Sequence, residues 1–154
     1  MNFRRQFPAH IPENGHRSIV PFIAILLMTA ALPAAQTPGA PAVTISGNIL
    51  GSSGHHKVYV ALWNANGFLV RPVEQVQIEP GAATIFHFRI TPGRYAVSAY
   101  EDENDNGRLD EGAFGPKEPS GFSRPFHGWR KPRFDDVATE IDRDTTDVNI
   151  RLSK

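Results

Sequence analysis

The 154-residue sequence contains no cysteine, and this absence excludes several kinds of protein at once. Without cysteine there is no disulfide framework, no thiolate metal site and no thiol nucleophile. A lipid-anchored exported protein is excluded as well, because its anchor needs a cysteine. The folded domain must therefore be held together by its apolar core, aided at most by a bound ion.

The sequence also lacks net charge and helical periodicity. The formal net charge is zero, so no general attraction to nucleic acid is expected. No stretch between residues 36 and 154 repeats its apolar residues with the period of a helix. The 13 Gly and 13 Pro instead favour short strands joined by turns.

The N-terminus has the pattern of a secretory signal peptide. Arg4, Arg5 and Arg17 precede an uncharged apolar stretch at 19–35, and small residues follow it. Two prolines interrupt the stretch, which falls short of the roughly 20 residues that span a bilayer comfortably. We therefore expect residues 1–35 to be cleaved, membrane contact to be limited to this segment before cleavage, and the protein to be exported, either periplasmic or secreted.

The remaining chain is expected to be a flexible lead-in at 36–42 and one domain at 43–154. The lead-in is rich in Pro, Gly and Ala. Within the domain, Phe86, Phe88 and Ile90 alternate with more polar neighbours. A period of two with one apolar face is typical of an antiparallel sheet that lies on a core.

Similar patterns and turn signals define the other expected strands. They are 43–50, 57–64, 76–79, 84–90, 93–100 and 147–153, with a further strand at 136–141. About seven such strands predict an all-β fold, a single antiparallel β-sandwich of immunoglobulin or transthyretin type. The pattern is interrupted by one long loop at about 101–135, where function is most often found.

The loop opens with the acidic sequence D-x-N-x-N-G-x-x-D at 102–110. Oxygen-bearing side chains at alternate positions, followed by a glycine that permits a sharp turn, are typical of calcium loops. We expect Asp102, Asn104, Asn106 and Asp110 to bind calcium through their side chains and Arg108 through its carbonyl oxygen.

This loop differs from an EF-hand in two respects. Position 12 is Ala113, so the bidentate glutamate is missing, and the flanking segments are strand and loop. Glu111 or a residue from elsewhere would have to fill the gap, and the affinity is expected to fall toward roughly 10⁻⁴ to 10⁻³ M. The alternative is a solvated acidic turn, because Asn, Asp and Gly are favoured in turns.

A basic segment with interleaved aromatic residues follows, from Lys117 to Arg133, with Glu118 as its one acid. We favour a structural role, in which the calcium-bound loop orders this segment. The segment then folds over the acidic loop, and its aromatic residues pin it to the sandwich. The alternative is a surface for a cell-envelope glycan or an anion, since aromatic and arginine side chains recognise both. Its candidate ligand-binding residues are Arg124, Phe126, Trp129 and Arg130.

The sequence contains no recognisable catalytic constellation. Ser120 and Ser123 lie near His127, but a Gly-x-Ser-x-Gly elbow and an orienting acid are missing. The acidic loop is polar, which gives no reason for the raised pKa that a general acid needs. We therefore expect a non-enzymatic binding or structural module.

Several short segments, taken in order, resemble one family of exported bacterial proteins, domain of unknown function 2141. They are 58–64, 67–68, 92–97, 102–110, 114–116, 121–123 and 132–136. The resemblance implies an exported β-sandwich without an assigned activity. The family has His before the first loop Asp and Asn after Gly-Phe-Ser, where this chain has Glu101 and Arg124. Roles of that His and Asn therefore do not carry over.

Overall fold

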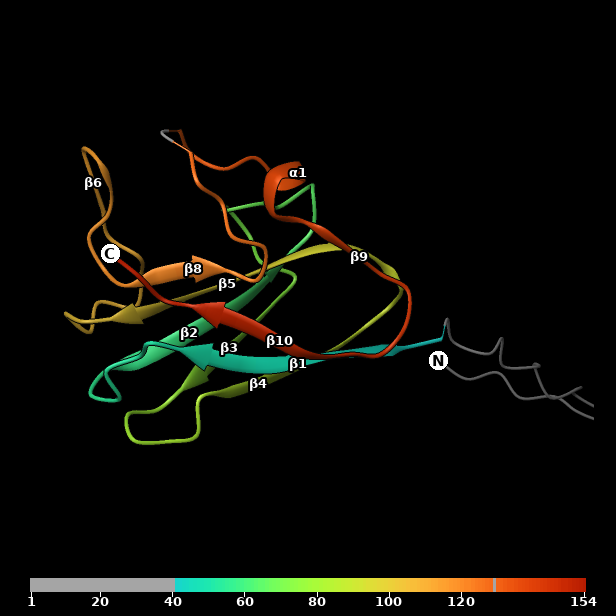
Figure 1. The fold of residues 1–154 in the computed structure, drawn as a ribbon, viewed down its shortest axis with the longest axis horizontal. Coiled ribbons are helices and arrows are strands. Elements are labelled where there is room, and N and C mark those ends of the chain that lie inside the picture. Colours follow the sequence, from blue (N-terminus) through green and yellow to red (C-terminus); the bar gives the residue numbers. More distant parts are fainter. Residues whose placement is uncertain (1–40, 129) are drawn as a thin grey trace, which may run out of the picture. The chain divides into compact units, whose positions relative to one another are not determined.

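The computed structural model describes residues 41–128 and 130–154 (Figure 1). The expected signal peptide at 1–35 and the candidate ligand-binding residue Trp129 lie outside the described residues. No helix in the described part of the chain is both long and apolar enough to cross a membrane.

Two sheets form where the sequence alternates apolar and polar residues. The three-stranded sheet has the order β10-β1-β4, with β10 at Thr145–Arg151, β1 at Val43–Leu50 and β4 at Ile85–Ile90. The second sheet has the order β3-β2-β5-β8, with β3 at Glu74–Ile78, β2 at Lys57–Trp63, β5 at Gly93–Asp102 and β8 at Ser120–Phe122. A short strand β9, Thr139–Ile141, pairs with the beginning of β5.

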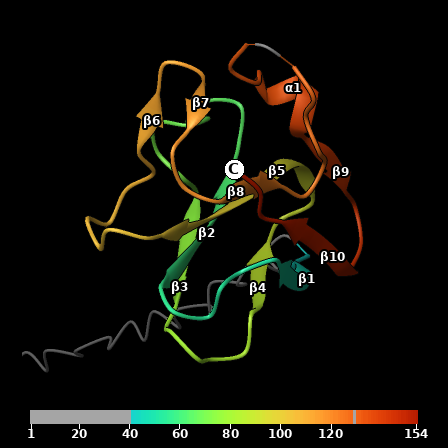
Figure 2. The ribbon, with the colours of Figure 1, turned by 60° about the vertical axis from the view of Figure 1, so that its left-hand side comes forward.

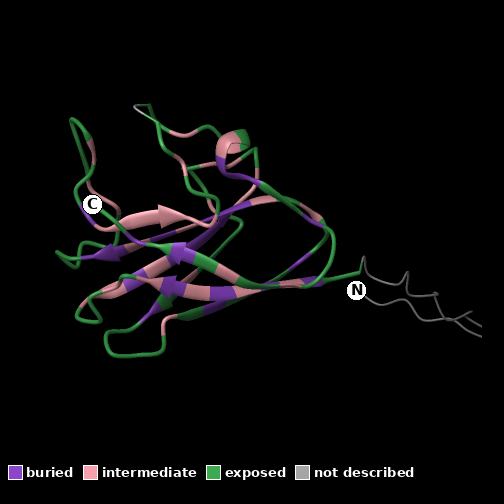
Figure 3. Cartoon of the chain, viewed as in Figure 1, coloured by how far each residue is buried: buried purple, intermediate pink, exposed green. Residues whose placement is uncertain are grey.

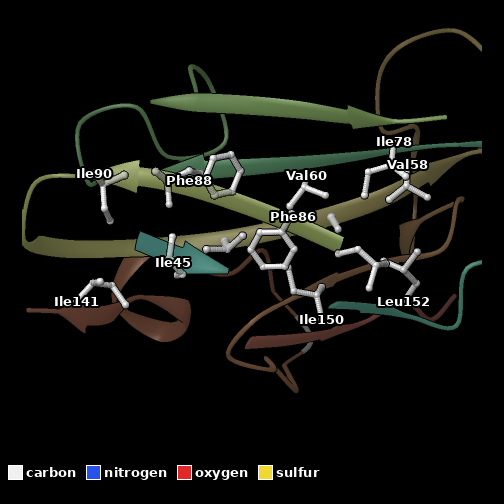
Figure 4. Packing of buried hydrophobic residues seen from close by; sticks show 14 of the residues in the cluster. Ile45, Val58, Val60, Ile78, Phe86, Phe88, Ile90, Ile141, Ile150 and Leu152 are labelled. Atoms are coloured by element: carbon white, nitrogen blue, oxygen red, sulfur yellow. The ribbon is translucent and has the colours of Figure 1, made fainter. Parts of the chain in front are cut away.

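The apolar faces of the two sheets meet in one main core. Phe86, Phe88 and Ile90 are buried, whereas the residues between them are exposed. Figure 3 shows this alternation of buried and more exposed residues along the strands. Side chains from both sheets, including Val60 and Ile150, interdigitate in the space between them (Figure 4). The all-β sandwich predicted from the sequence is confirmed.

One strand pairing is parallel, which side-chain alternation cannot reveal. Strand β10 runs parallel to β1, while β4 pairs with β1 in antiparallel orientation. The register of β1 and β10 shifts between Ile45 and Gly47, so that Thr146 and Asp147 both lie opposite Ser46. This is a β-bulge, an extra residue in one strand that locally disturbs the ladder.

The expected long loop at 101–135 contains more structure than its sequence indicated. Strand β5 extends into it as far as Asp102, and β8 adds to the edge of the sheet. Between them, β6 (Glu111–Gly112) and β7 (Gly115–Pro116) form a small hairpin. Figures 1 and 2 show the hairpin on the side of β8 that faces away from β1 and β4.

The strand expected at 136–141 is wrong in its first half. A one-turn helix α1 occupies Phe134–Val137, and β9 follows it. The Asp136 carboxylate accepts a hydrogen bond from the backbone N–H of Arg133 at 2.7 Å, which satisfies a donor at the start of the helix. Such a cap is local, and it outweighs the weak strand pattern of this segment.

Candidate functional site

The acidic loop begins where β5 ends, and its first residue is deeply buried. Asp102 is 1% exposed. Its two carboxylate oxygens accept hydrogen bonds from the backbone N–H groups of Asn106, at 3.1 Å, and Gly107, at 2.7 Å. The chain coils tightly around this carboxylate, and Asp105 and Gly107 adopt left-handed backbone angles, with φ of 56° and 76°.

Three of the predicted calcium ligands converge on one point. The side-chain amide nitrogens of Asn104 and Asn106 lie 2.8 and 3.1 Å from the same oxygen, Oδ2 of Asp110. The hydrogen bond from Asn104 holds the pKa of Asp110 below its ordinary value, and this effect, with help from Asn106 and Arg108, outweighs the opposing effect of burial. The carboxylate is therefore charged and is surrounded by polar groups.

Glu118, which was not among the predicted calcium ligands, holds the two ends of the acidic loop together. Glu118 is 3% exposed. One of its carboxylate oxygens accepts the N–H of Glu103 and the other accepts the N–H of Asp110, each at 3.0 Å. Glu118 thereby ties the beginning of the loop to its end. In the described part of the chain, neither Asp102 nor Glu118 takes part in an ion pair.

The exposed acids of the loop region are paired at its rim. The ion pairs are Lys57 with Asp105 (2.6 Å), Lys154 with Glu103 (2.7 Å) and Lys131 with Glu111 (2.8 Å). The hydrogen bond and negative charge of Asp105 raise the pKa of Lys57. Two of these cations come from the sandwich and the C-terminus, so the basic segment contributes less to neutralising the loop than the charge pattern suggested.

Phe122 and Phe126 of the basic segment lie in a second apolar cluster on the outer face of the larger sheet. Phe122, Phe126 and Phe134 pack there with Trp63, Phe68, Ala96, Val137 and Ala138. Phe68 contacts several of the other rings, with centroids about 6 Å apart. This cluster holds the segment on the sandwich.

The arginines proposed to bind a ligand are engaged within the fold. Arg130 makes a two-pronged ion pair with Asp136, at 2.7 and 3.0 Å, and its guanidinium lies 5.2 Å from the ring centroid of Phe126. Arg124 donates to the carbonyl oxygen of Ala138 at 3.3 Å. The hydrogen bond from Arg130 lowers the pKa of Asp136 to about 2. Arg124, Phe126 and Arg130 therefore each make a contact within the fold, and their binding of a ligand stays a prediction.

A further buried carboxylate, Glu101, fastens the turn between β1 and β2. It is 1% exposed, and it accepts hydrogen bonds from the backbone N–H of Ser53, at 2.9 Å, and from the Ser53 hydroxyl. Burial alone would raise the pKa of Glu101, but the hydrogen bonds from Ser53 outweigh it and hold the pKa below its ordinary value. The sequence marked Glu101 only as the residue that stands where the DUF2141 family has His, and it gave no sign of the contact with Ser53.

A surface hollow of about 280 Å³ adjoins the acidic loop. Its lining residues are His55, His56, Lys57, Glu79, Pro80, Asp102 and Asp105. Within residues 41–128 and 130–154, no group of three or more His, Cys, Asp or Glu side chains is placed to hold a metal ion. A cation in the loop would therefore depend on the amide and carbonyl oxygens of Asn104, Asn106 and Arg108 as well as on carboxylates.

Comparison with known proteins gives a family but no activity. A family model described as "Uncharacterized protein conserved in bacteria (DUF2141)" matches residues 48–149, which confirms the resemblance noted in the sequence. The comparison with curated proteins gives no match.

Among solved structures, the chain is similar to a DUF3823 family protein from Parabacteroides merdae ATCC 43184. The sequence identity is 14% and the TM-score is 0.35. The similarity covers 74% of this chain and 47% of the other, so this chain spans about half the length of the protein it matches.

Proposed function

Because the chain belongs to the DUF2141 family, whose description assigns no activity, we propose a function from its own residues: it is an exported, non-enzymatic β-sandwich module whose 102–110 loop binds Ca²⁺. The ligands are the side chains of Asp102, Asn104, Asn106 and Asp110 and the carbonyl oxygen of Arg108. The bound ion stabilises the loop and the hairpin that follows it.

The observation that carries this proposal is the convergence of two amides on one carboxylate oxygen. Asn104 and Asn106 both direct their amide nitrogens at Oδ2 of Asp110. The two partly positive NH₂ groups stand where a cation would neutralise the carboxylate. Rotating each amide about its terminal bond exchanges nitrogen for oxygen and turns the same three side chains into a set of oxygen ligands suited to a hard cation. The bound cation must then compensate for the hydrogen bonds that the amide oxygens of Asn104 and Asn106 accept from the backbone N–H groups of Asn106 and Arg108, at 3.2 and 3.0 Å.

Burial of carboxylates without ion-pair partners supports the same conclusion. Asp102 and Glu118 are almost completely buried, and backbone N–H groups are their hydrogen-bond donors. Such bonds satisfy the oxygens, but no cationic side chain among the described residues pairs with the negative charge of either carboxylate. A divalent cation at the loop would offset this charge. Since the bidentate glutamate of an EF-hand is missing, we expect a dissociation constant of roughly 10⁻⁴ to 10⁻³ M.

Thermal unfolding in calcium and in chelator tests the proposal. A ligand that binds only the folded state stabilises it by mass action. At about 10 mM Ca²⁺ the expected stabilisation is about 1.4 to 2.7 kcal/mol for that range of affinity. Asp110→Asn should abolish most of it, because a ligand charge is lost while the side-chain size is kept.

Asp105→Asn is the matched control. It removes the same charge from the same loop, but Asp105 is 70% exposed, pairs with Lys57 and is outside the ligand set. We expect this variant to keep the calcium response. An equal loss of response in both variants would reduce the effect to general electrostatic attraction, and an unchanged melting temperature in the parent protein would refute the proposal.

Export is the second part of the proposal, and the N-terminal sequence supports it. Arginines followed by an apolar stretch at 19–35 and small residues form a signal pattern. Expression in a bacterial host should give a periplasmic or secreted product whose measured mass lacks about the first 35 residues. A full-length product in the cytoplasm would contradict it.

A further inference from the structure

We propose that the outer face of the three-stranded sheet carries a second site, separate from the acidic loop, that binds a small neutral polyhydroxylated ligand such as a sugar ring. A surface hollow of about 310 Å³ lies there, near the lower end of the range typical of small-molecule sites. Its lining residues come from all three strands: Ser46, Gly47 and Asn48 of β1, Ile85, Phe86 and His87 of β4, and Thr146 and Asp147 of β10.

The hollow is located at the β-bulge between β1 and β10. Thr146 and Asp147 together lie opposite Ser46, so the extra residue displaces the β10 backbone and re-aims its side chains. The strands are close on the other side of the bulge, because a Cβ on Gly47 would lie 1.7 Å from the carbonyl oxygen of Val148. Glycine is therefore required at this position.

Asp147 adopts an unusual backbone conformation at the bulge. Its φ is 62°, in the left-handed region that non-glycine residues seldom occupy. Asp and Asn tolerate this region better than other residues, and such strained positions cluster at ligand-binding and active sites. The strain places a carboxylate beside two hydroxyl-bearing neighbours, Thr146 and Ser46.

The polar groups of the hollow are available to a ligand. Within the described residues, no hydrogen bond ties the side chain of Ser46, Asn48 or His87 to the rest of the chain, and Asp147 has a long contact of 3.4 Å with Thr146. The hydroxyl, amide and imidazole groups from adjacent strands can both donate and accept hydrogen bonds, and the carboxylate accepts them. Mixed donors and acceptors of this kind suit the hydroxyls of a sugar.

The charge and the apolar lining narrow the ligand class. The carboxylate of Asp147 disfavours an anion, and the described residues contain no group of three His, Cys, Asp or Glu placed for a metal. Ile85 is 62% exposed at the edge of the hollow, and its side chain can cover the apolar face of a sugar ring.

Amide NMR spectra of the protein with glucose and N-acetylglucosamine, each at about 100 mM, test this inference, because that concentration populates even millimolar sites. We expect shifts to cluster at Ser46, Asn48, His87 and Asp147. Asp147→Asn, which the left-handed conformation tolerates, and His87→Ala should each weaken binding roughly tenfold or more.

Arg89→Ala is the matched control, because Arg89 is exposed on the same strand and face as His87 but does not line the hollow. It should leave the shifts unchanged. No clustered shifts with either sugar would overturn the inference, and so would shifts of the same amides by inorganic phosphate or Ca²⁺ in place of the sugars. The result is independent of calcium binding at the 102–110 loop, because the two sites share no residue.

Discussion

The carboxylates of this protein differ in the groups that donate hydrogen bonds to them. Asp102 and Glu118 are held by backbone N–H groups, whereas Asp136 is held by the guanidinium of Arg130. Among the described residues, Asp102 and Glu118 have no ion-pair partner, whereas Asp136 does. This difference is why we assign a cation site to the acidic loop and a structural role to the residues around Arg130.

The pair of Arg130 and Asp136 gives a direct test by pH titration. The pKa of Asp136 is lowered to about 2. A carboxyl whose pKa is lower in the folded protein contributes stability above its ordinary pKa of about 3.9, and loses it as the pH falls toward 2. Arg130→Gln should return this pKa toward the ordinary value, as measured by carboxyl-carbon NMR. Arg143→Gln, an exposed arginine elsewhere, should leave the pKa of Asp136 unchanged.

The ligand set can also be tested by adding a charge to it. Asn104→Asp places a second carboxylate beside Asp110, where calcium loops often carry one, and ligand charge is one of the factors that set their affinity. We expect calcium to bind about tenfold more tightly by calorimetry, with lower stability in chelator because the two carboxylates repel. Asn66→Asp, the same change in an exposed turn far along the chain, is the control and should not change the affinity.

At the scale of elements, strands were predictable where one face is apolar. Phe86, Phe88 and Ile90 define β4 unambiguously because period two places them together on the core. The direction of β10 was not predictable, since alternation is the same in parallel and antiparallel strands. The sequence did not reveal strand β8, because its pairing with β5, which lies earlier in the chain, defines it. The sequence did not reveal helix α1 either, because the capping carboxylate of Asp136 decides so short a segment.

At the candidate site, the sequence predicted the loop at 102–110 but not the role of Glu118. The spacing of Asp102, Asn104, Asn106 and Asp110 revealed the loop, because ligands close in sequence leave a pattern. Glu118 belongs to no such spacing pattern, because it follows the hairpin and its burial depends on the fold. A lone acid within a basic segment was the available signal.

The β1–β2 turn provides a prediction at this scale, because one carboxylate fastens it. Glu101→Gln keeps the size of the side chain but removes the charge that accepts two hydrogen bonds from Ser53. We expect a loss of about 1 to 3 kcal/mol in the free energy of unfolding and faster hydrogen exchange at the Ser53 amide. Glu79→Gln, at an exposed position, should do neither. Unchanged exchange at Ser53 would show that the turn is held by other contacts.

At the scale of the whole molecule, a cysteine-free sandwich depends on its core. Phe88 has no exposed surface, whereas Phe114 at the tip of the hairpin is fully exposed. Phe88→Ala should therefore cost about 3 to 5 kcal/mol in urea unfolding, because it leaves a cavity. Phe114→Ala removes the same atoms from a solvated site and should change stability by less than about 0.5 kcal/mol. Similar losses in both variants would contradict the arrangement of the core.

The central claim is that the acidic loop binds calcium through its asparagine amides. The most direct measurement follows the side-chain NH₂ resonances of Asn104 and Asn106 during a calcium titration of the protein. We predict that both resonances shift together and saturate with a dissociation constant of roughly 10⁻⁴ to 10⁻³ M, since both amides must rotate to present oxygen. Resonances that stay unchanged up to about 10 mM Ca²⁺, well above that range, would contradict the claim and leave the loop a turn closed by its own hydrogen bonds.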